Sequence, residues 1–165
     1  MPPFGANGIE FNKAQTAMFV ANTAIDSIVE IPVSGAGAAN PTAGTPFVFT
    51  NSINGADGIA IDANDNIWVA ANQADEIVVV EPVHGKAIAK LGDFNGVQNG
   101  KTNGLLFPAS PAFSPNRESL WVTNLELDLR TIVGPTGQTI DSEWAKQVTE
   151  HSIAKLPTTI PAPGP

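Results

Sequence analysis

Short apolar segments separated by polar turns run along most of the chain. β-Branched and aromatic residues are frequent in these segments, which is typical of strands. The first group comprises residues 8–11, 18–22, 27–33 and 46–50 (GIEF, MFVAN, SIVEIPV and PFVFT), and the second comprises residues 58–61, 67–71, 76–82 and 87–94 (GIAI, IWVAA, EIVVVEP and AIAKLGDF). The pattern predicts two groups of four strands joined by turns.

The two groups are copies of one another. Residues 5–32 align with residues 55–82 after one deletion in a turn. Residues 111–124 form a third, fainter copy, which aligns without gaps on residues 9–22. Repeats of about fifty residues with four strands each are typical of β-propeller blades.

We therefore expect an all-β fold, a β-propeller of three four-stranded blades whose last blade lacks one strand. The predicted blades cover about residues 4–50, 51–100 and 101–156, and a Pro-rich tail follows at residues 157–165. Three blades do not close a ring, because propellers typically have four to eight. Either a second copy of the chain, as a homodimer, or a missing N-terminal half of a longer protein would complete it.

A long segment interrupts the third copy at residues 125–147. Within it, DSEWAKQ predicts a short helical turn, in which Trp144 caps one face of the propeller or anchors the insertion. Residues 148–156 (VTEHSIAKL) then predict the third strand of this blade. Residues 95–104 (NGVQNGKTNG) are Gly-rich but lack the order of a phosphate-binding loop, so we expect a flexible loop between blades.

Composition and charge exclude several classes of function. The formal net charge is −8 and no cluster of Lys or Arg occurs, so binding to nucleic acid is not expected. The chain has no Cys, which excludes disulfides and Cys-ligated zinc. No apolar run reaches about 18 residues, so no membrane-spanning helix is expected. The first residues, MPPFGANG, do not resemble a signal peptide.

Two polar residues stand at equivalent positions before the innermost predicted strands. Asn7 precedes Gly8 and Asp57 precedes Gly58, whereas the third copy has Ala109 at this position. Side chains at this position of a propeller point to the central channel, and their oxygens are hard ligands suited to Ca²⁺ or Mg²⁺. Asn or Asp before Gly is also ordinary turn chemistry, and the pattern alone favours that interpretation.

Other candidate residues favour structural roles. Residues 62–66 (DANDN) resemble the start of an EF-hand loop, but Ile67 stands where that loop needs Gly and Gln73 where it needs Glu, so a hairpin turn is favoured. His84 lies in a predicted turn and His151 on a predicted strand. Neither has a His or Cys nearby in sequence, so both are expected to be structural or surface groups.

Two tryptophans occupy matched strand positions in their copies, Trp68 in the second and Trp121 in the third. We expect both to lie in the core rather than to stack on a ligand. The chain has no G-x-S-x-G motif, so a serine hydrolase is not supported.

The motifs GANGIEF and GADGIAIDANDNIWVA resemble the senescence marker protein/gluconolactonase family, also called regucalcin-like, over most of residues 4–156. Members of this family are six-bladed propellers, and many are metal-dependent lactonases. The resemblance corresponds to the C-terminal half of the ring. Departures are Ala6 and Ala56 where the family has Pro, Asn66 where a turn Gly is usual, and the long insertion.

The resemblance implies that Asn7 and Asp57 are metal ligands and that Asp57 is also the catalytic general base. The implied cofactor is a divalent metal, Ca²⁺ first with Zn²⁺ or Mg²⁺ as alternatives, and the implied substrate is a small-molecule lactone or ester. A metal that holds few carboxylates can polarise a lactone carbonyl. Two ligands do not complete a Ca²⁺ site, which takes about six to eight oxygens.

Two alternatives to a hydrolase remain open. The chain is a non-catalytic binding module like the NHL-type propellers, which the loss of the polar residue at Ala109 would suit, or it is an inactive truncated member of the family. Dependence of thermal stability on Ca²⁺ distinguishes the hydrolase from the binding module. The composition favours an extracellular or periplasmic location for the full-length parent.

Overall fold

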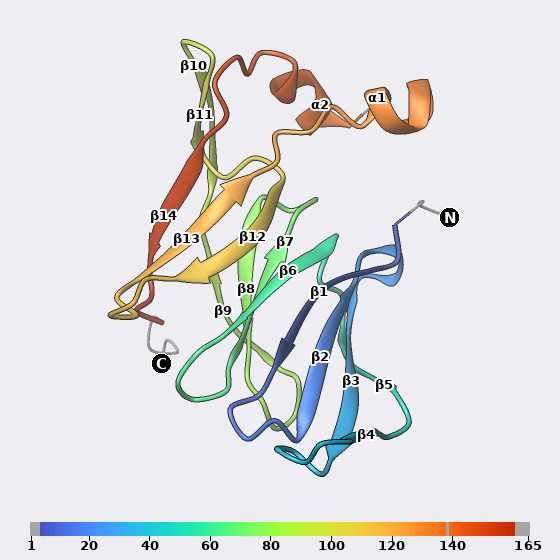
Figure 1. The fold of residues 1–165 in the computed structure, drawn as a ribbon. Coiled ribbons are helices and arrows are strands. Elements are labelled where there is room, and N and C mark those ends of the chain that lie inside the picture. The colour runs from blue at the N-terminus through green and yellow to red at the C-terminus, as the bar shows by residue number, and fades with distance from the viewer. Residues whose placement is uncertain (1–3, 138, 161–165) are drawn as a thin grey trace.

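The computed structural model describes residues 4–137 and 139–160 and is an all-β partial propeller of three blades (Figure 1). Each blade is an antiparallel sheet. The first contains β1 (Ala6–Phe11), β2 (Ala17–Asn22), β3 (Ser27–Ser34) and β5 (Phe47–Asn51), with the short β4 (Thr42–Ala43) beside the end of β3. The second contains β6 (Ala56–Ile61), β7 (Ile67–Ala71), β8 (Glu76–Val80) and β9 (Ala87–Leu91). The third contains β12 (Pro108–Phe113), β13 (Ser119–Asn124) and β14 (Ile153–Pro157).

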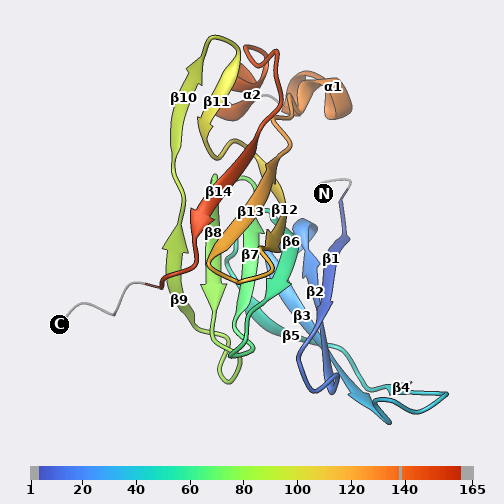
Figure 2. The same ribbon diagram turned by 60° about the vertical axis from the view of Figure 1, so that its left-hand side comes forward.

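The remaining elements connect strands and blades. The 3-10 turn η1 (Thr23–Ile25) joins β2 to β3, and β10 (Phe94–Gln98) pairs with β11 (Lys101–Gly104) in a separate hairpin before the third blade. Between β13 and β14 lie α1 (Arg130–Val133), η2 (Gly134–Gly137) and α2 (Ile140–Ala145). Figures 1 and 2 show these helices at the end of the molecule from which β1 starts.

The three blades and the three-stranded last blade agree with the sequence-based expectation, but other details differ. The loop expected at residues 95–104 is largely the β10–β11 hairpin. The two strands were not predicted because the segment contains several glycines at positive φ, and glycine weakens the sequence pattern of a strand. His151 precedes β14 instead of lying on a strand, and β14 extends to Pro157, which pairs with Ser119. Residues 161–165 of the predicted tail lie outside the described residues.

The innermost hairpin of each blade carries the same irregularity. The register shifts between Ala6 and Ile9 in the first blade, between Ala56 and Ile59 in the second, and between Pro108 and Pro111 in the third. Such bulges re-aim a side chain out of the regular alternation of a strand. Asn7, Asp57 and Ala109 therefore occupy equivalent places in the three blades, as the repeat alignment predicts.

Glycine is required beside this position in the first two blades. A Cβ added to Gly8 would overlap the backbone of Asp57 and Gly58, and a Cβ added to Gly58 would overlap the backbone of Ala109 and Ser110. The inner strands β1, β6 and β12 therefore lie side by side at backbone distance (Figure 1). This close approach brings the side chains that precede the glycines together at the centre of the propeller.

Two aspartates connect consecutive blades. Asp26, after β2, accepts a hydrogen bond of 2.8 Å from the backbone N–H of Gly55, directly before β6. Asp75, after β7, accepts one of 2.7 Å from the backbone N–H of Phe107, directly before β12. Both aspartates have a left-handed backbone with φ of 52°. The same short link therefore sets the position of the second blade on the first and of the third blade on the second.

The core lies in two layers between the blades. Phe19, Val69 and their neighbours fill the layer between the first and second blades, and Trp68, Val122 and their neighbours fill the layer between the second and third. Trp68 is 1% exposed and lies edge-on to Phe113, so its predicted core position is confirmed. The prediction for Trp121 is wrong: it is 44% exposed, because none of the described residues forms a further blade that covers its face.

Candidate functional site

Asp57 lies in the bulge of β6 and is almost completely buried. Its Oδ2 accepts a hydrogen bond of 3.1 Å from Nδ2 of Asn72, which follows β7 and is itself 3% exposed. Burial raises the pKa of Asp57, and the hydrogen bond from Asn72 partly opposes this effect. A raised pKa moves a carboxylate toward the range in which it can take a proton at neutral pH.

Asn7 lies in the equivalent bulge of β1, one blade earlier. Its Nδ2 donates a hydrogen bond of 3.4 Å to the hydroxyl oxygen of Thr23, which is buried. The Thr23 hydroxyl in turn donates to the backbone oxygen of Ala56, at 2.7 Å. Thr23 therefore connects Asn7 to the residue that precedes Asp57, across the junction of the two blades.

Asn7 and Asp57 both line one cavity of about 500 Å³, as the sequence predicts, together with Thr23 and Asn72. A volume of this order suits a small organic ligand. Ala109, the third member of the repeat, is absent from the described lining. The polar part of the cavity therefore comes from the first two blades.

Asn72 and Thr23 were missed by the sequence-based predictions. Both follow the second strand of their blade, and the sequence signal available was a polar residue directly after an apolar strand. The Oδ1 atom of Asn72 is buried and has no hydrogen-bond partner among the described residues. Such an unpaired atom carries a cost of about 1–3 kcal/mol, which the hydrogen bond from Asn72 to Asp57 partly offsets.

The insertion after β13 supplies most of the apolar lining of the cavity, to which Phe4 and Phe107 also contribute. Leu127, Leu129, Ile132 and Val133 line it, and Leu125 adds a further contact at the base of the insertion. The backbone N–H of Leu125 donates to the carbonyl oxygen of Phe107, at 2.9 Å. The segment expected only to interrupt the third blade is thus a wall of the candidate site.

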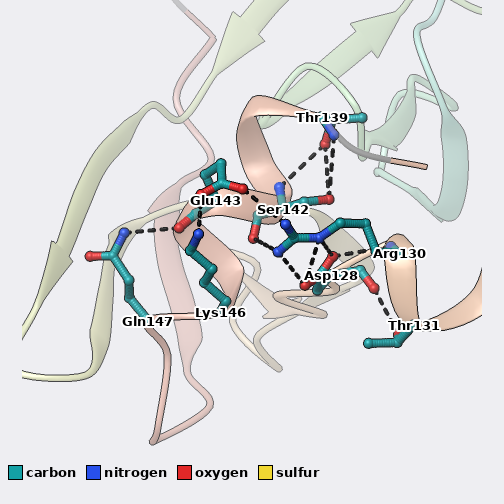
Figure 3. Close-up of polar contacts among 8 residues, drawn as sticks. All are labelled: Asp128, Arg130, Thr131, Thr139, Ser142, Glu143, Lys146 and Gln147. Carbon is teal, nitrogen blue, oxygen red and sulfur yellow. Dashed lines mark hydrogen bonds and ion pairs between the residues drawn. The ribbon is translucent and has the colours of Figure 1, made fainter. Parts of the chain in front are cut away.

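A network of charged side chains holds the insertion together (Figure 3). The Arg130 guanidinium donates to both carboxylate oxygens of Asp128, at 2.8 and 2.6 Å, and to Glu143 on α2, at 2.9 Å. The hydrogen bond from Arg130 lowers the pKa of Asp128 to about 2, so this carboxylate stays ionised. Glu143 also pairs with Lys146. The network fixes α1 against α2.

Two further contacts attach the insertion to the blades. Trp144 on α2 lies edge-on to Phe94 of β10, with ring centroids 5.4 Å apart, so it anchors the insertion. At the other end, the buried carboxylate of Glu126 accepts a hydrogen bond of 2.8 Å from the Ser152 hydroxyl and lies 2.7 Å from Nδ1 of His151. The side chain of His151 is largely exposed, so its expected surface position is confirmed.

The remaining candidates have structural roles. Asp62 accepts hydrogen bonds from the backbone of Asn64 and Asn66 and from the indole N–H of Trp68, so residues 62–66 form the predicted hairpin turn. His84 is an exposed turn residue, 3.5 Å from Glu81. Among residues 4–137 and 139–160, no group of three or more His, Cys, Asp or Glu side chains could hold a metal. No described helix is both long and apolar enough to span a membrane.

A family model for the SMP-30/gluconolactonase/LRE-like region matches residues 4–125. The chain belongs to this family. Two solved structures support the fold of this gluconolactonase-like chain. A luciferin-regenerating enzyme superposes with a TM-score of 0.67 at 18% identity, over 94% of this chain and 46% of that protein. Regucalcin from Agrobacterium tumefaciens, described as a calcium-binding protein, superposes with a TM-score of 0.58 at 26% identity, over 77% of this chain and 41% of that protein.

The gluconolactonase-like chain thus spans less than half the length of either structure. No curated protein matches its sequence. The family match and the two superpositions establish the family and the partial propeller.

Proposed function

We propose that this chain carries part of the active site of a divalent-metal-dependent hydrolase of lactones or related esters. The observation that carries the proposal is the meeting of Asn7 and Asp57 at one cavity, from equivalent bulges of adjacent blades. The family supports a gluconolactonase-like activity, since the matched region includes both residues.

The donor set fits Ca²⁺. Among the described residues, Asp57 uses only Oδ2 as an acceptor, which leaves Oδ1 free, and Asn7 uses only its amide nitrogen. An amide oxygen and a carboxylate oxygen at the edge of a cavity are ligands of the kind that Ca²⁺ prefers. The calcium-binding description of the regucalcin structure supports the same choice. The other ligands would come from water, substrate or another chain segment.

Each protein group has a definite part in the proposed reaction. Asn7 and Asp57 would hold the Ca²⁺, which would supply a Lewis acid for the carbonyl of the lactone. Asp57 takes the proton of the attacking water, for which its position in the lining of the cavity suits it. Asn72 keeps the Asp57 carboxylate in one orientation by its hydrogen bond, and Thr23 does the same for the Asn7 amide.

Hydrolysis of a panel of lactones by the purified chain, with Ca²⁺ and with a chelator, tests the proposal. We expect Ca²⁺-dependent turnover that Asp57→Asn abolishes. Asp65→Asn is the matched control, because Asp65 is a half-buried turn residue outside the described lining of the cavity. Asn tolerates its left-handed backbone and keeps the Oδ1 that accepts the hydrogen bond from the Lys13 backbone N–H. Turnover that survives Asp57→Asn, or that ignores Ca²⁺, would contradict the proposal and favour a non-catalytic binding module.

A further inference from the structure

The cavity beside Asp57 is chemically divided. The first two blades contribute its polar side chains Asn7, Thr23, Asp57, Asn72 and Gln73. The insertion contributes a mainly aliphatic wall, which consists of Leu125, Leu127, Leu129, Ile132 and Val133, with Thr136 beside it. We propose that this wall binds an alkyl substituent, so that the preferred substrate is an aliphatic lactone or ester and not a polyhydroxylated sugar lactone. This inference rests on the proposed function for its reacting group.

Desolvation explains the choice between the two substrate classes. A hydroxyl group of a sugar lactone placed against Leu129 or Val133 would lose its water without gaining a hydrogen bond, and such a loss is costly. An alkyl chain at the same wall gains from each methylene that it buries. Transfer of a methylene from water corresponds to roughly a fourfold gain in affinity. The cavity of about 500 Å³ has room for such a chain beside the ring.

The wall is held in place from both sides, so it can select a substrate shape. Arg130 of α1 pairs with Asp128, which lies just before this helix, and with Glu143 of α2. Glu126 lies between Leu125 and Leu127 of the wall in the sequence. Its buried carboxylate accepts a hydrogen bond from the Ser152 hydroxyl, which attaches this end of the wall to the third blade. An insertion attached in this way presents its apolar side chains at fixed positions, as a binding wall requires.

The binding test uses the hydrolytically inert lactam analogues of γ-butyrolactone, which has no alkyl substituent, γ-octalactone, which has a butyl group, and γ-decalactone, which has a hexyl group. Calorimetric titration of the whole chain with each, in Ca²⁺, should show affinity that rises roughly fourfold per methylene. Ile132→Asn should flatten this dependence. Ile25→Asn is the matched control, because Ile25 is 56% exposed and outside the described lining, whereas Ile132 is 52% exposed and within it.

The hydrolysis test separates this inference from the proposed function. Both the proposed function and the apolar wall are supported if kcat/KM rises from γ-butyrolactone to γ-octalactone and if kcat/KM for γ-octalactone exceeds kcat/KM for glucono-δ-lactone. Hydrolysis of glucono-δ-lactone with no gain from the alkyl chain would overturn the inference and leave the function standing. Chain-length-dependent binding without hydrolysis would support the wall and contradict the function. Absence of alkyl lactam binding to the folded chain would overturn the inference.

An independent observation concerns the two open faces of the blades. Ile9 and Phe11 of β1 are exposed, whereas their equivalents Ile59 and Ile61 of β6 pack on the preceding blade. On the third blade, the exposed Trp121 is the equivalent of Trp68, which packs on the following blade. Each open face thus carries one half of a blade-to-blade interface that the chain already builds twice.

We infer that a second copy of this chain closes the ring, because a second copy offers both missing halves. A two-fold axis would place the first blade of each copy on the third blade of the other and complete six blades. Exposed apolar faces of this kind mark interaction surfaces. Assembly through these faces is independent of the substrate.

Light scattering of the purified chain tests this arrangement. One chain has a mass of 17.1 kDa, and we expect twice this mass for the parent chain. Phe11→Asp and Trp121→Asp should each be monomeric. Val83→Asp, at an exposed turn away from both faces, is the control and should remain a dimer. A monomeric parent chain, or a dimer that both face variants leave intact, would overturn the inference.

Discussion

Replacement of Asn72 by Leu removes the one side-chain hydrogen bond that the Asp57 carboxylate accepts among the described residues. Leu has the same branched shape, and the larger volume of its methyl groups at this buried position affects stability equally at every pH. A hydrogen bond to a charged acceptor contributes about 1.5–3 kcal/mol, and one to a neutral acceptor about 0.5–1.5 kcal/mol. The substitution should therefore cost about 1 kcal/mol more while Asp57 is ionised than when it is protonated.

The sign of the pH dependence is set by the pKa of Asp57. Burial already raises this pKa above the unfolded value, so Asp57 favours the folded state most at low pH and loses that contribution as pH rises through its folded pKa. Without Asn72 the folded pKa rises further. The stability difference between the parent and Asn72→Leu should thus grow from acid to neutral pH.

Urea unfolding of both proteins across this pH range measures the difference directly. The unpaired Oδ1 of Asn72 also disappears in the variant, which offsets part of the loss equally at every pH. The pH-dependent part is therefore the decisive quantity. Asn54→Leu is the control, because Asn54 donates to a neutral backbone carbonyl, of Gln73. A stability difference for Asn72→Leu that does not change with pH would refute the reasoning.

Other contacts give three more predictions. Burial, opposed by the hydrogen bond from the Phe107 backbone, raises the pKa of Asp75 to about 6. The contribution of Asp75 to stability is therefore lost as pH rises from about 4 to 6. In urea unfolding, Asp75→Asn should remove a pH dependence of about 1–2 kcal/mol, after allowance for solvent screening. Gly58→Ala should lower stability by about 1–3 kcal/mol through overlap with the Ala109 carbonyl, whereas Gly5→Ala, with open space around it, should not; thermal unfolding compares them. Arg130→Met should increase hydrogen exchange in residues 128–145 and leave β6–β8 protected, whereas equal exchange in parent and variant would contradict the role of the ion-pair network.

Much of the fold could be predicted because the repeat fixes equivalence between positions. The alignment of Gly8 with Gly58 placed Asn7 and Asp57 at the same point of adjacent blades, and the shared bulge confirms that placement. The same alignment placed Trp68 in the core, where the structure has it. These patterns are local to one blade, and they predict equivalent positions correctly because each blade folds in the same way.

Contacts between distant segments could not be predicted in this way. The Asn72–Asp57 hydrogen bond depends on the direction of the Asn72 side chain after β7 ends, and the hydrophobic pattern of the sequence does not indicate this direction. The insertion carries no repeat, so nothing in its sequence alone placed Leu129 beside Asp57. Trp121 matched Trp68 in pattern but is exposed, because burial of a blade face requires a neighbouring blade to cover it. The cavity therefore required the structure, whereas the equivalent positions of Asn7 and Asp57 did not.

Calorimetric titration of Ca²⁺ into the chain tests the central claim most directly. The account predicts saturable binding that Asn7→Ala and Asp57→Asn each abolish or weaken at least about tenfold, as the loss of a ligand from a small oxygen site requires. Asp65→Asn should bind like the parent. Equal binding by the parent and Asp57→Asn, or loss of binding in Asp65→Asn alone, would contradict the account and place the cation elsewhere.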